Sequence, residues 1–253
     1  MKQINLLKKL SIMAAVAILM NACGTGTPKK AVEVELRNIN SAAQGNRFEL
    51  TFEKGKAHNH PSFAVWLENM DETMIQTLFV THSVGTGIFG HGDLGDGRWS
   101  PDSGKAIRPA TLPYWLHKRV GTEVESYTLP SPEKPVTDAY TGATPRANFQ
   151  MILTTDEKLS GKIRFMLEIN QTWDVNEYWT SNKYPDDFGY ISSRQPALVY
   201  AVTIDLENPE AEYILNPIGH SHYSGKDGKL YTDLSTFTTA LDIAEKMIVK
   251  VLN

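Results

Sequence analysis

The residues from Asp138 to Thr144 (Asp-Ala-Tyr-Thr-Gly-Ala-Thr) are the most specific candidate for chemistry in this sequence. They place a threonine hydroxyl directly after two small residues. A hydroxyl on an exposed loop can form a phosphoester, and small neighbours leave room for a bulky modifying enzyme. Pro145 stiffens the backbone that follows, and Arg146 could pair with the phosphate of such an ester. The residues of this segment are therefore chemically suited to a phosphoester.

The same residues also suit a purely structural role. A pattern that fixes five residues, here Asp138, Thr141, Gly142, Ala143 and Thr144, would occur by chance in roughly one of a thousand sequences of this length at ordinary residue frequencies. Chance is therefore a poor explanation for the segment. The alternative is a turn over Thr141 to Pro145, in which the Asp138 carboxylate accepts hydrogen bonds from loop amides. The sequence leaves both interpretations open.

The segment resembles the acceptor motif of covalently flavinylated proteins, in which Asp, two variable residues, Ser or Thr, and Gly-Ala-Thr follow one another. In those proteins a flavin transferase joins the phosphate of FMN to the hydroxyl of the last threonine. The resemblance implies covalent FMN on Thr144. The residues that the transferase would read are then Asp138, Thr141, Gly142 and Ala143. Candidates to stack on the flavin ring are Trp99, Trp115 and Tyr140.

A longer series of motifs resembles the bacterial "predicted periplasmic protein" family, domain of unknown function 2271, over roughly residues 45–205. The matching segments, in order, are Phe63–Asn69, Leu78–Val80, Leu112–Trp115, Asp138–Thr144 and Gly161–Glu168. This resemblance implies extracytoplasmic electron transfer, with a flavin transferase and a membrane redox protein as partners. Two residues depart from the family pattern: Ala139 replaces the usual glycine, and Pro145 replaces an arginine. The segment from about Ile214 to Asn253 lies outside the resemblance.

Two histidine pairs have a spacing that can bind metal. His58 and His60 lie two residues apart, as do His220 and His222, and on a strand each pair would share one face. Imidazole suits zinc or copper, but nothing in the sequence brings the two pairs together. We expect loop histidines that make ordinary hydrogen bonds, and no metal. Three further histidines stand alone: His82, His91 and His117.

Other segments suggest less specific chemistry. An acidic, aromatic-rich region could bind calcium or a sugar, although a solvated loop is the simpler interpretation; its acids are Glu168, Asp174, Glu177, Asp186 and Asp187. Ser224 to Lys229 contains Asp-Gly and predicts a tight hairpin turn rather than a phosphate loop. No nucleophile elbow is present in the sequence, so we expect a protein that is not a free-standing enzyme.

The N-terminus predicts export. Residues 1–22 combine three lysines with the apolar run from Ser11 to Met20, which suits a signal peptide and is too short to span a bilayer. Cys23 is the only cysteine and follows Met-Asn-Ala, as in a lipobox, so it is the expected lipidation site. Residues 23–44 would then be the lipidated cysteine and a flexible tether. We expect an anchor in the outer membrane, facing the periplasm.

Composition narrows the range of partners. The net charge of −4 and the lack of a lysine-rich block exclude a nucleic-acid-binding stripe, so no nucleic acid is expected as a partner. Hydrophobic content of 41% suits a folded domain. We expect one domain over residues 45–253, with a family-like core at 45–205 and a C-terminal extension at 206–253.

Period-two alternation predicts a mainly β fold that positions these residues. Expected strands are Arg47–Glu53, Ser62–Glu68, Met74–Val80, Asn148–Thr154, Lys162–Ile169, Ala197–Asp205, Glu212–Leu215 and Lys246–Leu252. Short helices are expected in Ala110–Arg119 and Thr238–Lys246 only. Together these elements indicate an antiparallel sandwich of the immunoglobulin or fibronectin kind. The long irregular stretches, Val84–Arg108 and Gln171–Pro196, are expected to be functional loops.

Overall fold

The computed structural model describes residues 34–120 and 129–252 of the chain. The predicted signal peptide, Cys23 and the first part of the predicted tether lie outside the described residues. The described residues all belong to one compact unit. It is mainly β, with 39% strand and 11% helix, which confirms the predicted class.

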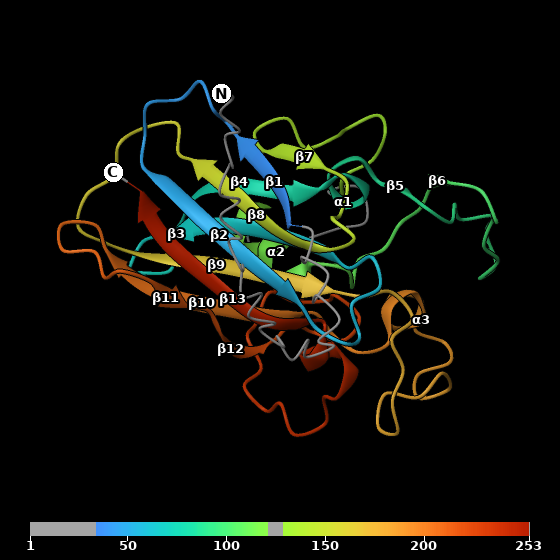
Figure 1. Cartoon of the computed structure of the whole chain (residues 1–253). Helices are drawn as coiled ribbons and strands as arrows, with labels where there is room; N and C mark the ends of the chain where they lie inside the picture. The colour runs from blue at the N-terminus through green and yellow to red at the C-terminus, as the bar shows by residue number, and fades with distance from the viewer. Residues whose placement is uncertain (1–33, 121–128, 253) are drawn as a thin grey trace, which may run out of the picture. The chain divides into compact units, whose positions relative to one another are not determined.

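Two large sheets form the domain (Figure 1). The first has five strands in the order β1 (Val34–Ile39), β8 (Asn148–Thr154), β2 (Arg47–Lys54), β13 (Ala244–Leu252) and β11 (Tyr213–Ile214). The second has six strands in the order β12 (Asn216–His220), β10 (Leu198–Asp205), β9 (Lys162–Asn170), β3 (Ser62–Glu68), β4 (Met74–Thr81) and β7 (Tyr140–Gly142). A separate pair joins β5 (Ile88–Phe89) to β6 (Gly104–Lys105).

One hydrophobic core lies between the two large sheets. Strand β2 alternates buried and half-exposed residues, so that Phe48, Leu50 and Phe52 all point inward. They pack in one cluster with inward side chains of the second sheet, such as Phe165 and Leu167 of β9. Burial of this apolar surface is the main force that holds the sheets together.

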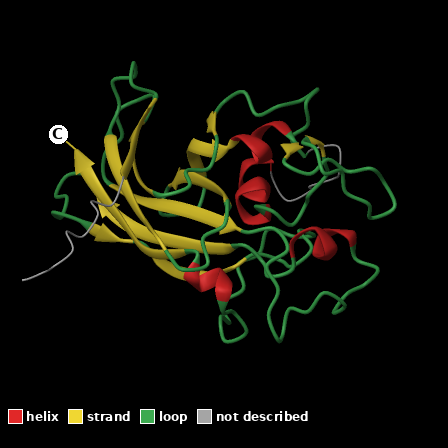
Figure 2. Cartoon of the chain, turned by 45° about the vertical axis from the view of Figure 1, so that its right-hand side comes forward, coloured by secondary structure: helices red, strands yellow, loops and turns green. Residues whose placement is uncertain are grey.

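Strand β3 is buried on both faces, because helix α2 (Pro113–Val120) covers the outer side of the second sheet. Trp66 of β3 and Trp115 of α2 are both fully buried in this second cluster. The indole N–H of Trp115 donates to the Thr77 hydroxyl at 3.0 Å. Figure 2 shows most of the helices and long loops on one side of the strands. The fold therefore has a third, partly helical layer over the second sheet.

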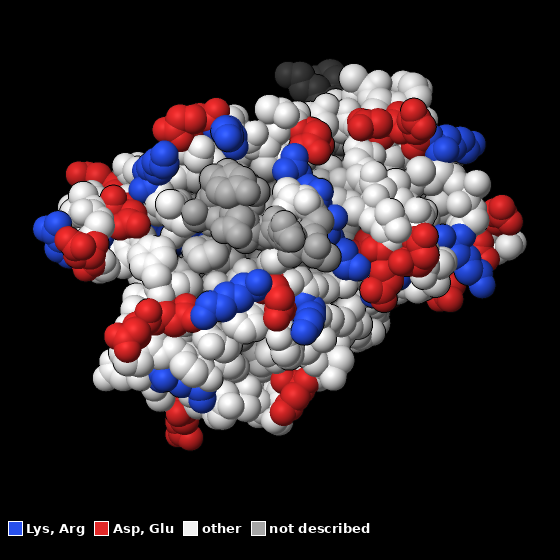
Figure 3. All heavy atoms as spheres, turned by 180° about the vertical axis from the view of Figure 1, so that it is seen from behind, with Lys and Arg blue, Asp and Glu red and all other residues white. Residues whose placement is uncertain are grey.

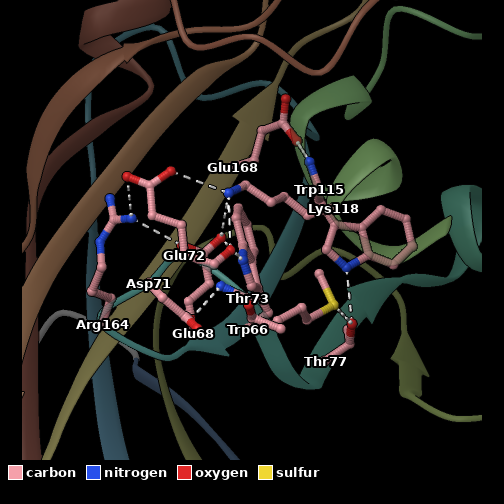
Figure 4. Close-up of polar contacts among 11 residues, drawn as sticks. Trp66, Glu68, Asp71, Glu72, Thr73, Thr77, Trp115, Lys118, Arg164 and Glu168 are labelled. Atoms are coloured by element: carbon pink, nitrogen blue, oxygen red, sulfur yellow. Dashed lines mark hydrogen bonds and ion pairs between the residues drawn. The ribbon is translucent and has the colours of Figure 1, made fainter. Parts of the chain in front are cut away.

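Two fully buried glutamates of neighbouring strands contact α2, Glu168 through hydrogen bonds and Glu68 through Lys118 at 3.9 Å (Figure 4). The carboxylate of Glu168 on β9 accepts the backbone N–H groups of Tyr114 and Trp115, which have no partner inside the first turn of the helix. Glu68 on β3 accepts the Trp66 indole N–H at 2.9 Å and forms an ion pair with Arg164 at 3.0 Å. Glu168 is therefore a structural residue that satisfies the start of α2.

The predicted strictly antiparallel arrangement is wrong in two places. Strand β1 pairs with β8 in parallel, and β4 pairs with β7 in parallel, so both large sheets are mixed. Both parallel partners, β1 and β7, are edge strands of their sheets, where a long connection can bring either direction alongside. Two facing sheets are present, whereas a specific immunoglobulin topology stays a prediction.

The ordered domain begins before the predicted boundary at residue 45. Residues Val34–Ile39 were expected within the tether, but they form β1 at the edge of the first sheet. Their side chains alternate between exposed and half-buried, which gives the segment little apolar signal. The 206–253 extension supplies β11, β12 and β13, so it completes both sheets of the same domain.

The structure has more helix than predicted. Helix α2 and the 3-10 helix η2 (Thr239–Asp242) lie where helices were expected, but α1 (His82–Thr86) and α3 (Phe188–Ser193) were not predicted. Both missed helices are too short for a helical apolar period to be visible. The segment Ser224–Lys229 is also not a tight hairpin, because the bridge between His220 and Tyr231 closes a wider loop around it.

The start of α3 depends on a close backbone contact. Asp187 caps the helix by accepting the N–H of Tyr190, and the helix lies against the backbone of Ser224. A Cβ added at Gly189 would lie 2.3 Å from the Ser224 carbonyl oxygen. We expect Gly189→Ala to lower the free energy of unfolding by about 1–3 kcal/mol. Gly90→Ala is the matched control, because an added Cβ there meets nothing within 4 Å. Urea unfolding of both variants checks this, and equal stability would contradict it.

Two surface properties complete the description. Among the described residues, no helix has both the length and the apolar character that a bilayer crossing requires. Figure 3 shows acidic and basic side chains interspersed over the face seen from behind.

Candidate functional site

A cleft of about 610 Å³ lies at one end of the second sheet. Four neighbouring strands bring their ends there: β3 begins at this end, and the antiparallel strands β4 and β9 finish there. Strand β7 runs parallel to β4 and therefore finishes at the same end. The cleft is lined by residues that follow β4, β7 and β9, together with the loop before β3. Sheet register thus gathers residues that are distant in sequence.

The acceptor-like motif lies on the edge of this sheet. Tyr140–Gly142 form β7, in register with Phe79–Thr81 of β4. The alternative interpretation as a turn capped by Asp138 is therefore wrong. Asp138 is exposed and forms an ion pair with Arg119 at the end of α2. Only the residues after Gly142 leave the sheet, and they carry the threonine into the cleft.

Close packing fixes the small residues of the motif. A Cβ on Gly142 would lie 3.1 Å from the ring of Phe79 and 3.2 Å from the guanidinium of Arg37, so a larger residue would displace one of them. Arg37 also donates from Nη1 to the carbonyl of Ala143. Since Arg37 belongs to β1, a strand that was predicted to be tether, the first sheet helps to position the motif. Thr141 is exposed, and its methyl group faces Gly85 of α1.

Thr144 lines the cleft with a half-buried side chain. Its hydroxyl donates to the carbonyl of Pro61 at 2.7 Å. This bond fixes the oxygen at the wall of the cleft, in the loop that precedes β3. Arg146 lines the same cleft and is exposed. The structure therefore brings together Thr144, Ala143 and Arg146 of the predicted site, whereas Asp138 and Thr141 lie outside the lining.

The cleft has a cationic character. Its described lining holds two arginines and three histidines and no carboxylate. These residues are Arg108, Arg146, His60, His82 and His91. His60 has a φ of 55°, and Trp173, also in the lining, has a φ of 61°. Such left-handed backbone in residues other than glycine is uncommon and tends to occur at functional sites. The arrangement suits an anionic ligand.

Arg108 is the most deeply placed cation of the cleft, with only 7% of its surface exposed. Its Nη1 donates to the Thr172 hydroxyl at 3.2 Å, and its Nη2 donates to the His91 carbonyl at 3.0 Å. The guanidinium carbon lies 4.6 Å from the ring centres of both Phe89 and Trp99. Burial lowers the pKa of Arg108 to about 10, while the charge of Asp93 acts in the opposite direction. The side chain is therefore held as a cation by rings and neutral acceptors.

Trp173 is the aromatic residue that the cleft presents, with 37% of its surface exposed. Of the three predicted stacking residues, Trp115 is fully buried under α2, so that expectation is wrong. Tyr140 is exposed on β7, where its hydroxyl donates to Asn40 at 2.8 Å, and is not part of the lining. Trp99 packs edge-on against Trp173 with ring centres 5.7 Å apart. Trp99 therefore lies behind the ring that faces the cleft.

The four histidines of the two predicted pairs have different main contacts in the structure. His58 packs its ring against Phe52, while His60 faces the cleft. His220 lies 4.8 Å from Phe237 between ring centres, and Nδ1 of His222 accepts the backbone N–H of Ser224. Burial lowers the pKa values of His58, His220 and His222. Within residues 34–120 and 129–252, no group of three or more potential ligands could hold a metal ion.

The acidic neighbourhood does not converge either. Glu168 serves α2, and Asp187 caps α3 and pairs with Lys226 at 3.0 Å. Asp174 accepts a hydrogen bond from Thr239 and contacts the η2 region. Glu177 and Asp186 are exposed. Among the described residues, these acids therefore do not form a group of three that could hold a calcium ion.

No protein-family model, curated protein or solved structure matches this chain. The resemblance to the periplasmic family therefore stays a prediction. The function has to be argued from the cleft and its residues.

Sequence reasoning missed two important residues of the cleft. Arg108 and Trp173 lie in the long irregular stretches, and neither belongs to a recognisable motif. The only available signal was the retention of aromatic residues in loops that would otherwise be polar. Their convergence depends on β3, β4 and β9 lying side by side, which spacing alone does not show.

Proposed function

We propose that this protein is a membrane-anchored extracytoplasmic electron-transfer protein that carries covalent FMN on Thr144. The observation that carries the proposal is the position of the Thr144 hydroxyl in a cationic, partly aromatic cleft with no carboxylate in its described lining. The resemblance to the flavinylation motif supports Thr144 as the attachment point, and the cleft has room for the attached flavin. The protein would pass electrons between a membrane redox partner and an acceptor.

The residues present fit the phosphate end of this group. A phosphoester on Thr144 would carry negative charge, and Arg146 lines the same cleft with an exposed guanidinium that can donate to it. Forming the ester removes the hydroxyl proton, so the Pro61 carbonyl would lose its present donor. Because the cleft is open to solvent at this wall, water can replace that hydrogen bond.

The residues also fit a planar ring. A cleft of about 610 Å³ lies within the range of ligand sites, which is about 300–1,000 Å³. Trp173 offers an exposed aromatic face, and the His91 ring lies 5.5 Å from it between centres. Flavin supplies redox chemistry when it is bound, while the protein holds the ring and sets the charge around it. The guanidinium carbon of Arg108 lies 5.4 Å from the centre of the Trp173 ring.

The proposal includes a cellular location for the protein and a relationship of its fold to known sandwiches. The signal peptide at 1–22 and lipidation of Cys23 would anchor the protein in the outer membrane, facing the periplasm. A flavin transferase would meet the motif there, because β7 lies on the sheet edge with Thr141 and Ala143 exposed. Two facing sheets with one core support a relationship to immunoglobulin-like sandwiches.

Intact-mass spectrometry of the full chain, co-expressed with a flavin transferase in the periplasm, tests the proposal. We expect an FMN-sized increment on the parent protein and none on Thr144→Val, which keeps the shape and removes the hydroxyl. The matched control is Ser83→Ala, which removes another hydroxyl of the cleft and should leave the increment in place. An unmodified parent, beside a control acceptor that the same transferase does modify, would exclude flavinylation.

A second candidate function is a non-catalytic binding or scaffold lipoprotein. It is supported by exposed aromatic side chains in the loop after β9, among them Tyr178, whose ring lies 3.3 Å from the Lys183 ammonium. Such a module would present its aromatic loops to a protein, a glycan or a metal ligand and would be colourless. The mass measurement therefore separates the two candidates.

A further inference from the structure

Arg108 is an unusual charge for its position. In the described part of the chain it forms no salt bridge, and its Nε–H is buried without a hydrogen-bond partner. A guanidinium has five N–H donors, and only two neutral acceptors bind it here. Burial lowers the pKa of Arg108 and the charge of Asp93 raises it, but Asp93 forms no ion pair with Arg108. A buried cation without a paired carboxylate is costly for a folded protein. The residue is therefore better explained by a ligand than by stability.

The surroundings define what such a ligand looks like. Three rings fix the guanidinium, with its carbon 4.6 Å from Phe89, 4.6 Å from Trp99 and 5.4 Å from Trp173. Trp173 leaves part of its surface open to the cleft. A cation held beside an open aromatic face in a largely water-excluded wall favours a planar ring that carries an oxyanion.

We infer that Arg108 anchors an anion-binding subsite of this cleft, which takes a planar aromatic ligand carrying a phosphate or a similar oxyanion without covalent attachment. Arg108 binds the oxyanion, and Trp173 packs against the ring. The inference concerns the same cleft as the proposed function but does not rest on it, because binding at Arg108 requires no ester at Thr144. In a flavinylated protein, the same subsite would hold the attached group closed against the cleft wall.

The test uses the full chain as Thr144→Val, produced without a flavin transferase, so that covalent modification cannot contribute. FMN, riboflavin and inorganic phosphate are titrated separately, and binding is followed by tryptophan quenching and flavin anisotropy. We expect FMN to bind about 10–100-fold more tightly than riboflavin, because charged hydrogen bonds contribute that much. Inorganic phosphate should displace FMN and leave bound riboflavin in place.

Variants of the arginine assign the effect. Arg108→Met should bring the affinity for FMN down to that for riboflavin, while Arg108→Lys should keep part of the preference because it keeps the charge. Arg98→Met is the matched control, since Arg98 is exposed in the same glycine-rich stretch and outside the cleft lining. Circular dichroism checks that each variant is folded.

Several results would overturn the proposed Arg108 subsite. Equal affinities for FMN and riboflavin in the Thr144→Val protein would overturn it without any arginine variant. So would a failure of all three probes to bind, or an Arg108→Met protein that binds FMN as tightly as Arg98→Met does. Absence of the mass increment on the parent chain would remove the covalent proposal alone and would leave this subsite as it stands.

Discussion

Raising the pH from about 5 to about 8 is expected to destabilise this domain through one buried carboxyl group. Glu168 is fully buried, and burial raises its pKa from the ordinary value of 4.5 to about 8, although the amides of Trp115 and Tyr114 act in the opposite direction. Between these two values the folded state holds a proton on Glu168 that the unfolded state has released. Protonation of Glu168 therefore stabilises the folded state fully below the pKa of the unfolded chain. This stabilisation is lost as the pH rises through the pKa of Glu168 in the folded protein. The slope approaches about 1.4 kcal/mol per pH unit.

The comparison that isolates this effect is Glu168→Gln, whose side chain has no charge in either state. Urea unfolding at several pH values should show a steeper fall in the free energy of unfolding for the parent than for the variant. Burial also raises the pKa of Glu68 and lowers those of His220 and His222, so the parent slope alone is a sum. Glu177→Gln, at an exposed site, should keep the parent slope. Identical slopes for Glu168→Gln and the parent would show that Glu168 is not the responsible group.

Truncation of Trp115 is expected to have the largest effect of any single change in the helical layer. The side chain is fully buried between α2 and the second sheet, and it donates its indole N–H to Thr77. Trp115→Ala should lower the free energy of unfolding by about 3–5 kcal/mol, because it leaves a cavity and an unpaired hydroxyl. Thermal and urea unfolding of the full chain measure this directly.

The matched control is Trp173→Ala. Trp173 has the same chemistry but is 37% exposed at the cleft, so its truncation should cost far less stability and should instead weaken ligand binding. Trp115→Phe should lie between the two, since it keeps most of the packing and loses the hydrogen bond. If Trp115→Ala and Trp173→Ala were equally stable, burial of Trp115 between α2 and the second sheet would not be a main source of stability.

The elements that follow strict alternation were predictable from sequence. Asn148–Thr154 was expected with the bounds that the structure has, because inward side chains of a half-buried strand must be apolar. Ser62–Glu68 also has its predicted bounds, although the structure buries this strand on both faces. Strand β1 was missed, since an edge strand with exposed Val34 and Leu36 carries no such constraint. Strand β7 was missed because three residues are too few to show a period.

The candidate site was predictable only in part. The motif could be found because its residues are contiguous, so Thr144 and Arg146 could be named together. Arg108 and Trp173 reach the same cleft from loops 65 residues apart in number, and that convergence is a product of sheet order. The prediction that Trp115 could stack on a flavin ring was wrong, because the residue type alone does not indicate whether a tryptophan lines a cleft or lies in the core. Local sequence patterns predict single strands, whereas the residues that meet across a sheet can be identified only from the folded structure.

The position of β13 has a consequence for how the chain matures. This strand lies between β2 and β11 in the first sheet, although it is synthesised after every other strand. Until Ala244–Leu252 has been synthesised, β2 has no neighbour on one side, and the core residues beside that edge are not covered. Most native pairings of this sheet join distant parts of the chain, which slows folding. The first sheet therefore cannot reach its native strand order until the last strand of the chain has been made.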